Sequence, residues 1–68
     1  MNEATQERER GRLDEERRVR RWRREQFVTM GFSPTEARRL TTAAVDLGDM
    51  RRLLRAGCPL DTARQILL

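Results

Sequence analysis

The residues best suited to chemistry are six arginines within the eight-residue run 17–24, which contains no acidic residue. All fifteen basic residues of the chain are arginine. A guanidinium group can form paired hydrogen bonds with a carboxylate or a phosphate. The run therefore predicts a binding surface for an acidic protein groove or for a phosphate backbone. Its arginines are Arg17, Arg18, Arg20, Arg21, Arg23 and Arg24.

A helix over this run would be amphipathic, with arginines on one side and an apolar stripe on another. Positions three and four apart are neighbours on a helix, so one side would gather Arg17, Arg20, Arg21 and Arg24. Another side would carry an apolar stripe of Val19, Trp22, Gln26, Phe27 and Met30, flanked by Arg18 and Arg23. This arrangement predicts docking on a larger protein, with an apolar anchor and a charged rim. The predicted anchor is Val19, Trp22, Phe27 and Met30, and the predicted rim is Arg17, Arg20, Arg21 and Arg24.

Nucleic-acid binding is the alternative function. Trp22 could stack on a base, although a Trp within an apolar stripe more commonly packs in a small core or an interface. The net charge of only +4 and the acidic residues within 3–16 argue against general DNA binding. A helix-turn-helix over 27–45 would add Arg38 and Arg39 to the six arginines of the run.

Composition argues against an enzyme. The chain has no histidine and one cysteine, so general acid–base catalysis, a disulfide and a zinc site all lack their usual residues. Cys58 is predicted to be a buried apolar plug and not a nucleophile. We expect no catalytic residue, metal, cofactor or small-molecule substrate. No run approaches the roughly 18 apolar residues of a membrane span, and the N-terminus lacks the apolar core of a signal peptide. We therefore expect a soluble protein that is not exported by the usual route.

A helix stop and a helix start follow the arginine run. Gly31 predicts the left-handed residue that ends a helix, and Phe32 is the apolar contact that accompanies such an end. Ser33 is predicted to cap the next helix, with Pro34 at its first position and Glu36 completing a capping box. Two helices are therefore expected to meet here.

The whole pattern predicts an all-α fold. Residues 1–12 are expected to be disordered or frayed, 13–30 to form the arginine-rich amphipathic helix, and 31–68 to form a compact bundle of three short helices. Asp14 with Arg18 and Glu16 with Arg20 are predicted ion pairs on the first helix.

The bundle helices are expected over residues 34–45, 50–56 and 60–68, with Asp49 capping the second and Gly57 ending it. The predicted inner faces are Ala37, Leu40, Thr41 and Ala44; Met50, Leu53 and Leu54; and Leu60, Ala63, Ile66 and Leu67. The segments from Phe27 and from Leu53 also match at an offset of 26 residues, which predicts a duplicated helix–Gly–helix unit.

The segment REQFVTMGFSPTEARRL resembles the opening of a ubiquitin-associated domain. Met30, Gly31 and Phe32 match the loop after the first helix of that family, Ala37 and Leu40 match its second helix, and the paired C-terminal leucines are similar to those that close its third. The resemblance implies a compact bundle of three or four helices. It also implies an apolar binding face formed by the loop and the last helix.

A second resemblance covers residues 21–68. The strings RWRREQFVTMGF and LLRAGCPLDTARQIL are similar to the short arginine-rich proteins of tailed phages and prophages of high-GC actinobacteria. This resemblance implies a role in virion assembly, as a minor capsid or portal-associated protein, and a place in the virion or in the host cytoplasm. It transfers no catalytic or binding residue.

Overall fold

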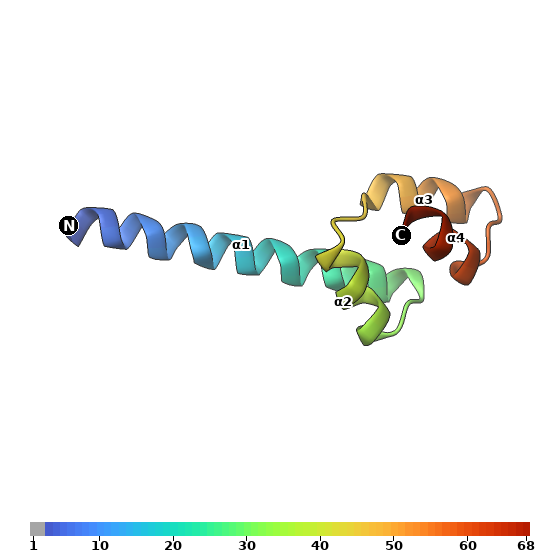
Figure 1. Ribbon diagram of the computed structural model, residues 1–68, viewed down its shortest axis with the longest axis horizontal. Helices are drawn as coiled ribbons and strands as arrows, with labels where there is room; N and C mark the ends of the chain where they lie inside the picture. Colours follow the sequence, from blue (N-terminus) through green and yellow to red (C-terminus); the bar gives the residue numbers. More distant parts are fainter. Residues whose placement is uncertain (1–2) are drawn as a thin grey trace.

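The computed structural model describes the backbone of residues 3–68 and the side chains of residues 10–68. It contains four helices, α1 (Glu3–Met30), α2 (Pro34–Thr42), α3 (Leu47–Arg55) and α4 (Leu60–Leu67), and these described residues include no strand. The all-α prediction is therefore confirmed. Three short helices gather at the C-terminal end of α1, whose N-terminal part projects from them (Figure 1). The molecule is consequently elongated, with extents of 53 × 18 × 16 Å.

Helix α1 is longer than the sequence predicted. It begins at Glu3 and includes residues 3–12, which were expected to be disordered or frayed; Met1 and Asn2 lie outside the described residues. Most residues of this segment have high intrinsic helix propensity, and the one glycine, Gly11, costs about 1 kcal/mol relative to alanine without forcing a break.

The expected ion pairs along α1 do not form. Within residues 10–68, Asp49 and Arg52 form the one ion pair, with 2.6 Å between Oδ1 and the guanidinium nitrogen. Asp14 and Arg18 do not form an ion pair, and neither do Glu16 and Arg20. Exposed charges gain little from pairing, because water solvates them and pairing restricts two long side chains. The first helix therefore does not depend on these pairs.

The core lies where the end of α1 meets the three short helices. Phe27, Leu40 and Met50 are its largest fully buried side chains. Phe27 and Phe32 contact edge to face, with ring centroids 6.3 Å apart. The remaining buried core residues are Ala37, Val45, Leu47 and Ala63, and the half-buried residues packed against them are Met30, Leu53, Leu54, Cys58, Leu60 and Leu67. All of these residues come from the last four residues of α1 or from the segments after it.

The turn after α1 has the predicted chemistry. The N–H of Gly31 donates to the carbonyl of Val28 (3.0 Å), and the N–H of Phe32 donates to the carbonyl of Phe27 (3.2 Å). Gly31 has a φ of 117°, which favours glycine, and an added Cβ would lie 3.0 Å from Leu60 Cδ1. The Oγ of Ser33 accepts from the N–H of Glu36 at 3.1 Å, so the predicted cap is confirmed.

The same helix ending occurs three times, at intervals of 13 residues. Ala44 and Val45 repeat the two hydrogen bonds of Gly31 and Phe32, and so do Gly57 and Cys58, with all four distances between 3.0 and 3.1 Å. The predicted offset of 26 is thus two periods of a 13-residue unit. The N-cap positions follow the same interval at Ser33, Asp46 and Pro59, as do the fully buried Ala37, Met50 and Ala63.

The middle unit was not recognised because its left-handed position is Ala44, with a φ of 56°, and not glycine. Helix α2 therefore ends at Thr42 and not near residue 45, and Ala44 is exposed and not on the inner face. Thr41 is half-buried, as its predicted place at the edge of that face requires.

Helices α3 and α4 also differ from their predicted bounds. Asp46 and not Asp49 caps α3, because Asp46 Oδ2 accepts from the N–H of Asp49 at 2.9 Å. The helix consequently begins at Leu47, which is buried and was expected in a break. Helix α4 ends at Leu67, and its Ile66 is 59% exposed, so this residue is not on the inner face.

Ala44→Gly is expected to stabilise the bundle. A left-handed conformation costs an L-residue about 1–2 kcal/mol, and the greater freedom of glycine in the unfolded chain offsets part of the gain. The net expectation is about 0.5–1 kcal/mol, or a rise of several degrees in melting temperature for a chain of this size. Thermal unfolding followed by circular dichroism measures it. Ala43→Gly, one residue earlier and with a φ of −77°, is the matched control and should destabilise.

Candidate interaction surfaces on the first helix

Within residues 10–30, the part of α1 whose side chains the structure describes, most residues are exposed. Every residue from 10 to 22 is exposed, and burial begins only with the half-buried Arg23. We call residues 10–22 the arm. Because α2 and α3 are only nine residues each, they cover one end of a 28-residue helix and leave the arm in water (Figure 1).

The predicted apolar anchor is divided between the core and the arm. Phe27 is fully buried and Met30 is half-buried against the core, so these two residues stabilise the chain itself and are not free to anchor a partner. Trp22 and Val19 remain 51% and 54% exposed on the arm. Of the two predicted places for Trp22, a small core or an interface, the core of this chain is therefore excluded, and the interface stays a prediction. We call Val19 and Trp22 the arm stripe.

A hydrogen bond marks the place where the arm stripe meets the bundle. Gln26 follows Trp22 by four positions, and its Oε1 accepts from an Arg51 guanidinium nitrogen of α3 at 3.1 Å. This contact joins α1 to α3 at the surface.

The predicted arginine side of α1 forms one wall of a groove. Helix α2 supplies the other wall, and the hollow between them measures about 370 Å³. We call it the arginine groove; its lining residues are Arg17, Arg20, Arg21, Arg24, Arg38, Thr41 and Thr42. Among the residues that the structure describes, no carboxylate lines it. Arg38, from the predicted second set of nucleic-acid contacts, thus joins the four arginines of α1.

Three predicted arginines lie elsewhere. Arg39 lines a neighbouring hollow that shares Arg38 and Thr42 with the arginine groove and also includes Ala43 and Leu68. Arg18 is exposed on the arm outside the arginine groove, and Arg23 lines a different groove. The eight arginines proposed for nucleic acid therefore do not form one surface.

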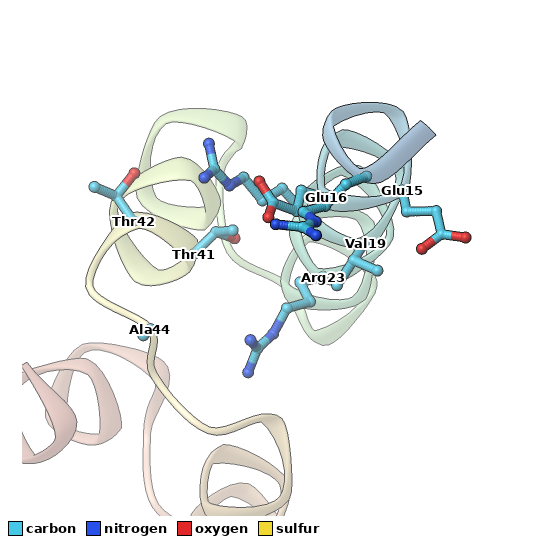
Figure 2. Close-up of a pocket in the computed structure, with 9 residues that line it drawn as sticks. Glu15, Glu16, Val19, Arg23, Thr41, Thr42 and Ala44 are labelled. Atoms are coloured by element: carbon cyan, nitrogen blue, oxygen red, sulfur yellow. The ribbon is translucent and has the colours of Figure 1, made fainter. Parts of the chain in front are cut away.

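The groove that Arg23 lines lies between the arm and the C-terminal end of α2, and its volume is about 630 Å³ (Figure 2). We call it the mixed-charge groove. Its lining is of mixed charge: Arg12, Glu15, Glu16, Val19, Arg20, Arg23, Thr41, Thr42 and Ala44. Figure 2 shows Glu15 on the side of α1 that faces away from α2. Carboxylates and guanidinium groups in one open hollow largely balance each other, so this groove has no strong preference for an anion.

The arginine groove and the arm stripe lie on opposite sides of α1. At about 100° per residue, the mean direction of Arg17, Arg20, Arg21 and Arg24 is roughly opposite to that of Val19 and Trp22. Val19 also lines the mixed-charge groove, which shares Arg20, Thr41 and Thr42 with the arginine groove, whereas Trp22 lines neither. Trp22 can therefore be altered without changing the arginine groove. The four α1 arginines of this groove do not form the rim around the stripe that the sequence predicted.

The remaining chemistry of the chain is sparse. Within the described residues, no group of three metal-ligating side chains comes together, and no helix is both long and apolar enough to cross a membrane. Cys58 is half-buried against the core at the position that Phe32 has in the first turn, as the repeat predicted.

Sequence reasoning included Thr42 with Arg38 among the exposed residues of the predicted helix-turn-helix but missed Thr41 as a groove residue. The signal for Thr41 was its spacing of three from Arg38, which places it beside Arg38 on α2. Comparisons with protein-family models, with curated proteins and with solved structures gave no match for this chain. Function must therefore be inferred from these surfaces.

Proposed function

We propose that this chain is a non-enzymatic interaction module that docks on a larger protein through its arm. The observation that carries the proposal is the exposure of Trp22 and Val19, side by side on a helix that projects from the folded bundle. Trp is the most strongly enriched residue type among the energetically dominant contacts of protein interfaces. Its large apolar surface gains free energy when a partner removes it from water.

The charge around the arm stripe indicates the chemistry of the partner. Arg18 precedes Trp22 by four positions and Arg23 follows Val19 by four, so guanidinium groups lie on both flanks of the stripe. A fitting partner offers an apolar hollow for the indole with carboxylates at its edge. Such a rim aligns the partner and speeds association more than it adds affinity.

The bundle serves as the folded anchor of the arm. Its core contains no residue of the arm, because Phe27 is the first fully buried residue among the described side chains of α1, residues 10–30. Changes on the arm are therefore expected to alter docking without unfolding the bundle. Together with the resemblance to actinobacterial phage proteins, this design favours a capsid or portal assembly as the partner, in the virion or in the host cytoplasm.

The test is co-expression with candidate capsid and portal proteins from the genome that encodes this chain, followed by measurement of the dissociation constant for any protein that co-purifies. Trp22→Ala is expected to weaken docking by about thirty-fold, equivalent to about 2 kcal/mol. Arg18→Ala and Arg23→Ala, which remove the charges that flank the stripe, should weaken it only about two- to fivefold. Leu13→Ala is the matched control, since Leu13 is 52% exposed on the same arm but outside the stripe.

Two outcomes would overturn the proposal. One is that no complex forms with any of the co-expressed capsid and portal proteins. The other is a complex that Trp22→Ala and Leu13→Ala weaken equally, because that result would show that the stripe is not the anchor.

A further inference from the structure

We propose that the arginine groove binds the phosphodiester backbone of a nucleic acid, as a second site that is independent of protein docking. The groove brings five guanidinium groups together from two helices. No carboxylate among the described residues lines the groove itself, although Glu25 shares a neighbouring hollow with Arg21, Arg24 and Arg38. The arginines outnumber the nearby carboxylates, so their positive charges still repel one another. A polyanion in the groove would relieve this repulsion.

The spacing of the groove arginines fits a strand of phosphates. Arg17 and Arg24 are seven positions apart on α1, which corresponds to about 10 Å along the helix axis. Successive phosphates of one strand advance about 3.4 Å along a duplex axis, so the row spans about three phosphates. Arg20 and Arg21 lie between the two ends of this row.

Helix α2 supplies the second wall of this site. Arg38 faces the row from α2, and Thr41 and Thr42 follow it by three and four positions. The hydroxyl of Thr41 donates its one hydrogen to the carbonyl of Ala37 at 2.8 Å, so Thr42 supplies the hydroxyl that can donate to a phosphate oxygen. Hydroxyl groups beside arginines are common phosphate contacts in nucleic-acid interfaces.

The lining favours nucleic acid over an acidic protein. A specific protein interface needs an apolar centre, whereas nucleic-acid interfaces are polar and strongly positive. No large apolar side chain lines the arginine groove, since its seven residues are arginines and threonines. The apolar residues suited to a protein partner are Val19 and Trp22, on the opposite side of α1.

The test measures the binding of the full chain to a labelled 20-base-pair duplex and to a labelled 20-nucleotide single strand by fluorescence anisotropy, across a range of salt concentrations. The groove variant is Arg17→Gln/Arg20→Gln/Arg38→Gln. The control is Arg51→Gln/Arg52→Gln/Arg55→Gln on α3. All six arginines are exposed, and both variants lose three charges.

The groove variant is expected to bind at least tenfold more weakly at low salt. Its slope of log affinity against log salt on the duplex should be shallower by roughly 2.7, since each lost phosphate contact removes about 0.9. The α3 control should stay within threefold of the unaltered chain. Trp22→Ala should stay within twofold, which distinguishes this site from the protein-docking stripe.

Three results would overturn the inference. The first is no binding of either oligonucleotide at low salt. The second is equal weakening by the two arginine variants, which would show that only net charge matters. The third is binding of poly-glutamate as tight as that of the oligonucleotides, which would assign the groove to an acidic protein. Circular dichroism confirms that each variant keeps its helices.

Discussion

Phe27→Ala is expected to unfold the bundle. Phe27 is fully buried and packs edge to face on Phe32, and it is the residue by which α1 enters the core. Removing a buried phenylalanine side chain costs about 3–5 kcal/mol. A single core in a chain below about 70–80 residues rarely supplies more than 3–5 kcal/mol in total. The change therefore removes about as much stability as the bundle has.

Amide chemical-shift dispersion and thermal unfolding by circular dichroism measure this effect. The control is Val28→Ala, because Val28 is the next residue and is 43% exposed. Its effect should stay within about 0.5 kcal/mol. A cooperative melting transition retained by Phe27→Ala would show that the core does not depend on α1.

Leu40→Ala is expected to have the second largest effect, about 2–5 kcal/mol, because Leu40 is fully buried at the centre of the core. It occupies the same place in its 13-residue unit as Phe27, Leu53 and Ile66 do in theirs. Leu53→Ala should reduce the free energy of unfolding by less, because Leu53 is only half-buried. Ile66→Ala should cost about 0.5 kcal/mol or less, since Ile66 is 59% exposed.

Thermal unfolding of the three alanine variants tests the order Leu40, Leu53, Ile66. This order follows from how deeply each side chain is buried. It does not follow from the repeat, because alanine substitutions at equivalent positions of a perfect repeat would destabilise the protein equally. Equal losses at Leu40 and Ile66 would contradict the packing described above.

The sequence predicted best those local features that depend on one residue type. Gly31 and Gly57 showed two helix ends, because few other residues favour a positive φ, and Ser33 with Pro34 showed a helix start. The end of α2 was missed because Ala44 adopts the same conformation at a cost that the surrounding core must offset. No single-residue signal distinguishes it from an alanine within a helix.

The start of α3 was missed for a different reason. Asp46 and Asp49 are both good capping residues, and they lie three positions apart, so either could begin a helix. The choice depends on Leu47, which is buried in the core only if the helix begins before it. Tertiary packing therefore decides this boundary.

The sequence predicted only part of each candidate surface. The arginines of α1 share a side by their spacing alone, but Arg38 joins them only through the angle at which α2 packs. The apolar stripe is continuous in sequence from Val19 to Met30, whereas the short helices cover only its end. Periodicity predicts which side of a helix is apolar, but it does not predict how much of that side the rest of the chain buries.

Acrylamide quenching of Trp22 fluorescence reports directly on docking through the arm stripe, since Trp22 is the one tryptophan of the chain. In the free protein, we expect quenching close to that of the urea-unfolded chain, because the indole is half exposed on the arm. In complex with the proposed protein partner, quenching should fall severalfold. An indole already shielded in the free chain, or one that the partner leaves equally accessible, would contradict docking through the arm stripe.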